Sequence, residues 1–97
     1  MKRRAKVDRN HGEIRDALRA MGWYVYDTSR LGDGFVDLVC AKHGRLELVE
    51  VKDGSLPPSE RRLTKAEDEV IADFQRHGVF VRVVCSLDDV MLMDAEP

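Results

Sequence analysis

The stretch FVDLVCAKHGRLELVEVK, residues 35–52, decides the fold of this chain. Two apolar, β-branched runs over residues 35–41 and 46–52 flank the polar segment KHGR, a pattern that predicts a β-hairpin. Alternate residues of a strand share a face. A symmetric turn without a bulge pairs Lys42 with Arg45 and therefore places Asp37 directly opposite Glu50. Lys52 follows on the same face of the second strand.

Facing acids of this kind point to a metal site. Two carboxylates directly opposite each other on an apolar hairpin repel. A divalent cation removes the repulsion, and Mg²⁺ is typically held by one or two carboxylates, waters and substrate phosphate. Such a site can activate water, and Lys52 beside it can position that water or stabilise a phosphate. The alternative is a surface ion pair of Glu50 with Lys52, and a solvated Asp37. Because the three residues share one face, we favour the site.

The remaining elements complete an α/β domain. Periodic apolar residues predict helices over residues 9–21, 64–77 and 86–93, and further strands over residues 23–26 and 79–85. Thr64 and Glu67 form the pattern of a capping box. The second helix is expected to bury Ala66, Val70, Ile71 and Phe74. The order αβββαβα predicts a mixed sheet flanked by helices, with a right-handed parallel crossover into the last strand.

Composition narrows the classes of protein further. A chain of 97 residues with 43% apolar and 35% charged residues is one globular domain, which excludes collagen-like and disordered classes. It holds no apolar run of about 18 residues, so no membrane span is expected. Cys40 and Cys85 lie in apolar runs without metal-ligand spacing. We interpret both as buried thiols of a reducing compartment.

Charge is distributed unevenly along the chain. Residues 1–30 carry eight Lys or Arg against four acids, whereas residues 31–97 carry eight against fourteen. Residues 1–8 are expected to form a flexible basic arm, which fits either a nucleic-acid contact or a solvated terminus. No apolar stretch follows it, so it does not have the pattern of a secretory signal.

The motif GFVDL (residues 34–38) followed by VEVK (residues 49–52) resembles the PD-(D/E)XK nuclease signature. It is more closely similar to the VRR-NUC family, the virus-type replication-repair nucleases. The likeness covers nearly the whole chain. It includes an acid in the first helix, a helix that opens with Leu-Thr, and a late strand after a glycine. It implies a single VRR-NUC-type domain over residues 1–97, with the restriction-endonuclease-like fold.

The resemblance also implies roles for individual residues. Asp37 and Glu50 would bind Mg²⁺ or Mn²⁺, with the backbone carbonyl of Val51 as a further ligand. Lys52 would be the catalytic lysine. Glu13 falls where the family has a helix acid that contacts the metal through water or holds a second ion. Its alternative role is that of a solvated helix residue.

The chain departs from the family pattern at two positions. The proline that usually precedes the aspartate is Val36 here, which needs only an extended backbone. The glutamine of the helix after the third strand is replaced by Glu67. Glutamine can donate a hydrogen bond to phosphate and an ionised glutamate cannot. Glu67 is therefore either an accessory catalytic residue or only the capping-box acid.

The family likeness implies a metal-dependent, structure-specific endodeoxyribonuclease in the cytoplasm of a bacterial or phage-infected cell. So small a domain would recognise DNA by its backbone and shape. A homodimer acting on four-way (Holliday) junctions is the leading expectation. A flap, end or nicking nuclease and an inactive DNA- or partner-binding module are the alternatives. His11 could touch phosphate. The expected phosphate contacts are basic residues of the arm, of one loop and of the second helix's start: Lys2, Arg3, Arg4, Lys6, Arg9, Arg30, Arg61, Arg62 and Lys65.

Overall fold

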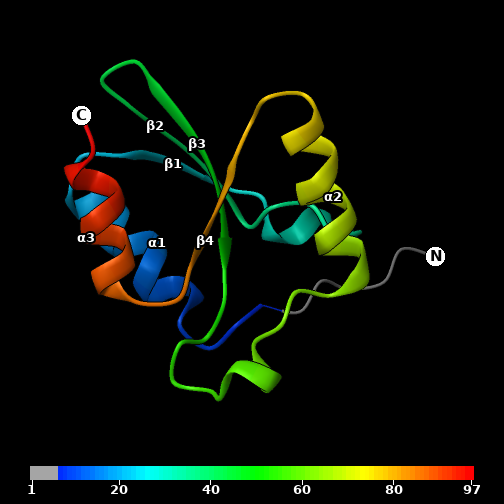
Figure 1. The fold of residues 1–97 in the computed structure, drawn as a ribbon. Coiled ribbons are helices and arrows are strands. Elements are labelled where there is room, and N and C mark those ends of the chain that lie inside the picture. Colours follow the sequence, from blue (N-terminus) through cyan, green and yellow to red (C-terminus); the bar gives the residue numbers. More distant parts are fainter. Residues whose placement is uncertain (1–6) are drawn as a thin grey trace.

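The computed structural model describes residues 7–97, which form a four-stranded mixed sheet with helices on both faces (Figure 1). The predicted order of helices and strands is confirmed, and two short 3₁₀ segments, η1 and η2, are added to it. In chain order the elements are α1 (His11–Ala20), β1 (Tyr24–Asp27), η1 (Ser29–Leu31), β2 (Leu38–Lys42), β3 (Arg45–Val51), η2 (Pro58–Glu60), α2 (Lys65–Arg76), β4 (Val81–Val84) and α3 (Leu87–Ala95).

The sheet has the strand order β1-β2-β3-β4, with antiparallel pairs up to β3 and a parallel pair between β3 and β4. Lys42 pairs with Arg45 across the hairpin, as the symmetric turn predicts. His43 and Gly44 both have positive φ, 49° and 81°. These are the conformations that a two-residue type I′ turn requires. The turn therefore fixes the register of β2 against β3.

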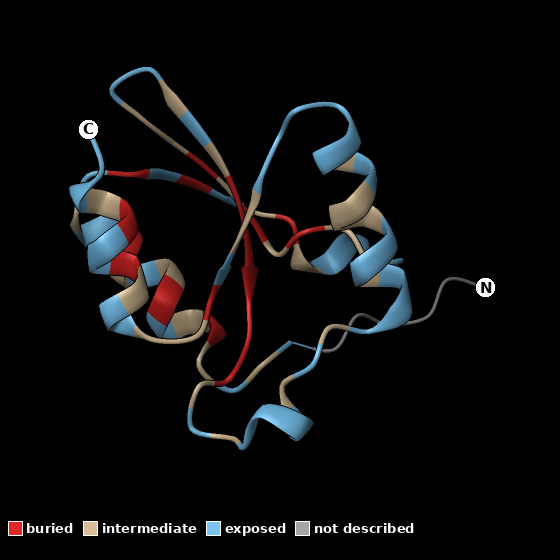
Figure 2. Cartoon of the chain, in the orientation of Figure 1, coloured by how far each residue is buried: buried red, intermediate tan, exposed pale blue. Residues whose placement is uncertain are grey.

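The core lies between the sheet and two helices, α1 and α3, which cover the same face (Figures 1 and 2). Ile14 and Leu18 of α1, and Val90 and Met93 of α3, are buried against strand residues that alternate along the sheet. Those strand residues are Val25, Leu38, Cys40, Val49, Val51 and Val84. Helices α1 and α3 therefore cover one face of the sheet, and the opposite face is left for contacts with other elements.

Helix α2 lies on the opposite face, and it packs less closely than predicted. Ala66 is exposed, and Val70, Ile71 and Phe74 are only half-buried. Helical spacing shows which residues share a face and does not show that anything covers that face. The ring of Phe74 lies 6.2 Å from that of Phe35, between centroids. At 12 residues α2 is the longest helix, and none in the described part has the length and apolarity to cross a bilayer.

The start of β2 differs from the prediction. The strand begins at Leu38 rather than at Phe35. The Val36 carbonyl accepts the Thr28 hydroxyl at 2.6 Å, so it is taken up by the loop after β1. Gly34 has a φ of 82°, and a Cβ there would lie 2.4 Å from the backbone of α2. Only glycine allows this close approach of the loop to the helix.

Smaller differences occur at other boundaries. Strand β4 begins at Val81 because the Val79 N–H closes the preceding helix on the Phe74 carbonyl (2.9 Å). Helix α1 begins at His11, two residues later than predicted. Strand β3 begins and ends one residue earlier than predicted, and helix α3 ends two residues later than predicted.

The two cysteines differ in burial. Cys40 is a core residue, and burial raises the pKa of its thiol to about 12. Cys85 is only half-buried, so the prediction of a buried thiol is confirmed for Cys40 alone.

Candidate active site

Asp37 lies where the chain enters β2, at a β-bulge. The predicted register is confirmed as far as Leu38 opposite Val49. The Asp37 N–H also points to the Val49 carbonyl, at 3.0 Å, so two residues of this strand oppose one of its partner. The prediction that Asp37 directly opposes Glu50 assumed no bulge and is wrong in that detail. The bulge turns the carboxylate along β3, where Oδ2 accepts the Val51 N–H at 2.8 Å.

Glu50 is the most deeply buried acid of the site. It is 1% exposed, and neither carboxylate oxygen has a hydrogen-bond partner within residues 7–97. Burial, followed by the nearby carboxyls of Glu67 and Asp37, raises the pKa of Glu50 to about 10. Burial likewise raises the pKa of Asp37, against the opposing effect of its hydrogen bond from Val51. The structure therefore brings the two predicted acids together, with Glu50 buried and Asp37 half-buried.

Lys52 lies beside this pair, as predicted, and is 7% exposed. Its Nζ is 3.8 Å from Glu50 Oε2 and 2.7 Å from Glu67 Oε1. Although burial alone would lower it, the hydrogen bond to Glu67 and the surrounding acids raise the pKa of Lys52. Burial opposes ionisation of Glu67 too, but Glu50, Lys52 and the Thr64 N–H lower its pKa to about 2. The resulting cluster contains one ammonium among three carboxyls.

The Val51 carbonyl faces the same edge of β3 as the Asp37 carboxylate. In an extended strand the N–H and C=O of one residue point to the same side. The Val51 N–H points to Asp37, so its carbonyl does as well. The backbone group that the family likeness names as a ligand is thus directed towards the acids.

These groups fit a divalent cation of the magnesium type. The buried, unpartnered oxygens of Glu50 are costly without a compensating charge, and a cation beside Asp37 would supply it. Within residues 7–97 no three His, Cys, Asp or Glu side chains form a ready metal cage. Two carboxylates and a carbonyl would fill only part of a coordination shell, which suits Mg²⁺ because it retains several waters.

His11 joins the surroundings of the site, whereas the sequence indicated only that it could touch phosphate. Its ring is buried, and Nε2 lies 2.9 Å from Asp27 Oδ2. The residue after Asp27, Thr28, donates its N–H to the Asp37 carbonyl at 2.8 Å. His11 and Asp27 therefore fasten the start of α1 to the loop that carries Asp37. No short sequence pattern joins these positions.

Asn10 makes a second connection that sequence reasoning missed. Its Nδ2 donates to the carbonyls of Lys52 and Cys85, at 3.1 and 3.0 Å, and so bridges the ends of β3 and β4. Arg9 contacts Asp53 and Ser55, at 3.3 and 2.8 Å. Arg9 and Asn10 together therefore hold the chain at Lys52 and in the residues that follow it.

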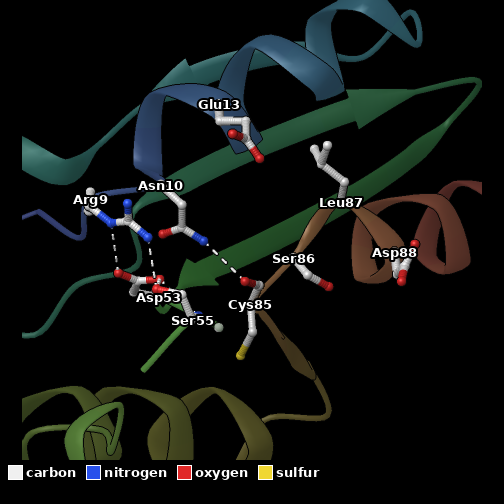
Figure 3. Close-up of a pocket in the computed structure, with 10 residues that line it drawn as sticks. Arg9, Asn10, Glu13, Asp53, Ser55, Cys85, Ser86, Leu87 and Asp88 are labelled. Atoms are coloured by element: carbon white, nitrogen blue, oxygen red, sulfur yellow. Dashed lines mark hydrogen bonds and ion pairs between the residues drawn. The ribbon is translucent and has the colours of Figure 1, made fainter. Parts of the chain in front are cut away.

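Glu13 is not brought to the acidic cluster. It is exposed on α1 and lines a separate cavity of about 390 Å³, together with Asn10, Asp53 and Asp88 (Figure 3). Within the described residues no hydrogen bond or ion pair joins it to the cluster. Its position favours the solvated helix residue over the metal contact.

The predicted phosphate contacts divide into three groups. Lys2, Arg3, Arg4 and Lys6 lie outside the described residues. Arg9 and Arg61 are engaged, Arg61 with the Gly54 carbonyl at 3.3 Å. The others are exposed, and no ion pair within residues 7–97 holds them: Arg30, Arg62 and Lys65.

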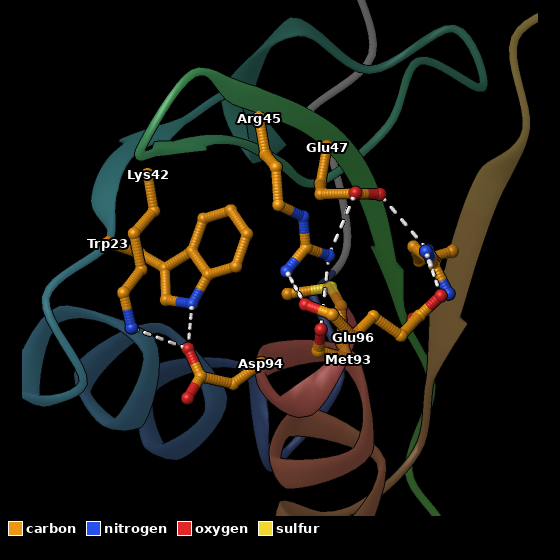
Figure 4. A network of polar contacts seen from close by, with 8 residues as sticks. Trp23, Lys42, Arg45, Glu47, Met93, Asp94 and Glu96 are labelled. Atoms are coloured by element: carbon orange, nitrogen blue, oxygen red, sulfur yellow. Dashed lines mark hydrogen bonds and ion pairs between the residues drawn. The ribbon is translucent and has the colours of Figure 1, made fainter.

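A separate network of charges lies at the other end of the sheet (Figure 4). Glu47 accepts hydrogen bonds from Arg45 and Arg82, at 3.1 and 3.0 Å. Asp94 accepts the indole N–H of Trp23 at 2.9 Å. Every one of these carboxylates has a partner, and the network ties α3 to the sheet.

Comparison with protein-family models, with curated proteins and with solved structures found no match to this chain.

Proposed function

We propose that this protein is a divalent-metal-dependent, structure-specific endodeoxyribonuclease that hydrolyses DNA phosphodiester bonds. The observation that supports this most strongly is the buried Glu50, which has no hydrogen-bond partner in the described chain, beside the half-buried Asp37 and with Lys52 next to it. An acid pair with an adjacent lysine is a set of groups that phosphodiester hydrolysis uses.

Each residue of the cluster has a role in this proposal. Asp37, Glu50 and the Val51 carbonyl would hold Mg²⁺ or Mn²⁺. Bound there, the ion would supply Lewis-acid neutralisation of the phosphate and a lower pKa for water. Lys52 keeps its proton and directs its ammonium at the oxygens of the scissile phosphate, where negative charge develops. Its burial excludes competing water and strengthens that interaction.

The DNA would be recognised mainly through its phosphates. Arg62 and Lys65 are exposed directly before and at the start of α2, the helix whose Glu67 contacts Lys52. Arg30 is exposed on η1, which precedes the loop that leads to Asp37. These contacts position the backbone and carry no sequence information, which favours recognition of DNA shape.

A homodimer that places two sites on a four-way junction is part of the proposal. The face of the sheet opposite α1 carries Tyr24, Tyr26 and Leu46, which are 67%, 61% and 68% exposed. The two tyrosines together expose on the order of 250 Å². This is about a third of what each partner contributes to a standard interface of ~800 Å² per side. A second copy would cover this apolar face.

The homodimer is tested by light scattering after size-exclusion chromatography. L46D should give a monomer at concentrations where the wild type is a dimer. L92D is the matched control, because Leu92 is equally exposed (70%) but lies on α3, on the other side of the molecule. A monomeric wild type, or a dimer that survives L46D, would remove this part of the proposal.

The activity is tested with labelled four-way junction, flap and linear duplex DNA, each in Mg²⁺ and in Mn²⁺. Wild type is compared with D37N and K52A. Paired symmetric nicks on the junction, lost in both variants, are the expected result. Cutting mainly at flaps or ends would retain the chemistry and discard the junction. Cutting that persists in both variants would contradict the assigned site, and DNA binding without cutting would favour an inactive binding module.

A further inference from the structure

The carboxylate of Glu67 takes part in two different contacts, one with the helix cap at Thr64 and one with Lys52. Its Oε1 accepts the backbone N–H of Thr64 at 2.8 Å, and its own N–H donates to the Thr64 hydroxyl at 3.1 Å. This is the reciprocal capping box that begins α2. The same Oε1 lies 2.7 Å from Lys52 Nζ. The residue that caps the helix is therefore also the nearest partner of the candidate catalytic lysine.

The distances show which acid determines where the Lys52 ammonium lies. Glu67 is in direct hydrogen-bond contact with it, whereas the nearest oxygen of Glu50 is 3.8 Å away. The Lys52 side chain is 8% exposed, so water offers it little alternative. A charge-assisted bond between buried groups is stronger than the same bond in water. Without Glu67 the ammonium would move towards Glu50.

The capping box gives Glu67 a fixed position from which to act. Its carboxylate is restrained by the Thr64 N–H, and the start of α2 is restrained where Ala66 meets Gly34. No residue of α2 is fully buried, so the rest of the helix adds little restraint. The start of α2 thus sets the place of Lys52.

We propose that Glu67 is a positioning residue that holds the Lys52 ammonium in place for phosphodiester hydrolysis, a role that rests on the proposed nuclease function. Glu67 itself does not touch the reacting atoms. Its carboxylate is a charged acceptor that binds the lysine directly. A glutamine at this position keeps an oxygen that can accept from both Thr64 and Lys52.

The test measures single-turnover cleavage rate and DNA affinity separately. E67A should lower the rate by about 10- to 100-fold, because small misplacements of a catalytic group have effects of this size. DNA affinity should change less than ~2-fold, and E67Q should recover the rate to within ~3-fold of wild type. A rate for E67A equal to that of wild type, or no recovery in E67Q, would overturn the proposal.

Two matched variants separate positioning from helix stability. T64A removes the capping hydroxyl and leaves the Glu67–Lys52 contact, and D68A removes a neighbouring exposed acid in the same turn. D68A should cleave at the wild-type rate, and T64A should lose clearly less than E67A, because the Thr64 N–H still donates to the Glu67 carboxylate. If T64A slows cleavage as much as E67A, the effect belongs to the helix and the proposal is wrong.

A double-substitution cycle tests the contact without any reference to activity. The thermal unfolding midpoints of K52M, E67A and the double variant are compared with wild type, because E67A removes the carboxylate that accepts from Lys52. Coupling predicts that the double variant lies above the sum of the two single shifts. Additive shifts would overturn the positioning role even if the wild type cleaves DNA. An inactive wild type with clear coupling would instead remove the nuclease function, and the catalytic role with it.

Discussion

Two glutamates of the same strand, Glu47 and Glu50, have opposite surroundings. Glu47 lies in the network at the hairpin end, where Arg45 and Arg82 each donate to one of its carboxylate oxygens. Glu50 is three residues further along, on the other face of β3, and neither of its oxygens is hydrogen-bonded within the described chain. The nearest cation, Lys52, is held closer to another acid.

The presence or absence of hydrogen-bond partners distinguishes a carboxylate that stabilises the fold from one that belongs to a functional site. Buried polar groups that only stabilise a structure are nearly always paired. Glu47 follows that rule, and its two arginines join the sheet to α3. Glu50 breaks it, and retaining such an acid costs stability unless a ligand compensates. We therefore place the function at Glu50 and its neighbours, and a purely structural role at Glu47.

The largest effect on stability is expected from E50Q in the metal-free protein. The folded-state pKa of Glu50 is about 10 against an ordinary 4.5, so between these values the folded state binds the extra proton. The stability of the wild type must then fall as pH rises through this range. E50Q has no carboxyl group to ionise, so it does not lose this stability. Its unfolding midpoint should exceed that of wild type by ~5 °C or more near pH 8.

Thermal unfolding in chelator, followed across pH, checks this prediction. Near pH 4 both forms carry a neutral side chain and should unfold at similar temperatures. A wild type that gains stability from pH 5 to pH 9 relative to E50Q would show that Glu50 is ionised and compensated within the fold.

An intermediate effect of opposite sign is expected from E47Q. This change leaves Arg45 and Arg82 without their shared carboxylate, which should cost about 1–3 kcal/mol of unfolding free energy. Cleavage should stay within ~2-fold of wild type, because the network lies at the other end of the sheet. Urea unfolding and the junction assay on one preparation measure both. An E47Q protein that is stable but inactive would reverse the roles assigned to the two glutamates.

The smallest effect is expected from E13Q. Glu13 is exposed and lines a separate cavity, so the change should alter cleavage less than ~3-fold and stability within ~0.5 kcal/mol. Rates at several Mn²⁺ concentrations provide the measurement. A large loss that excess Mn²⁺ restores would return Glu13 to the metal, as the family likeness implies.

The sequence predicted what depends on local periodicity. A two-residue turn and the two-residue repeat of strands determine the hairpin register, so Leu38 opposite Val49 followed directly. Thr64 and Glu67 identified the capping box by spacing alone. Both features involve short segments whose geometry allows few alternatives.

What the sequence could not predict depends on how distant segments meet. The bulge at Asp37 arises because the preceding loop is bonded to Thr28, and no motif reports that contact. The Lys52–Glu67 contact needs the place where α2 meets the sheet. The partners of His11 and Asn10 lie 16 or more residues away. For the same reason, the half-buried state of α2 was not foreseen.

Whether Glu50, which has no hydrogen-bond partner in the described chain, belongs to a metal-dependent catalytic site is decided by single-turnover cleavage of a labelled four-way junction in Mn²⁺ with wild type, E50Q and E47Q. Folding of each protein is verified first by circular dichroism. We expect E50Q to lose about a thousandfold in rate and E47Q to cleave like the wild type. E50Q cleaving at the wild-type rate, or a folded wild type that cuts none of the DNA structures, would contradict this expectation.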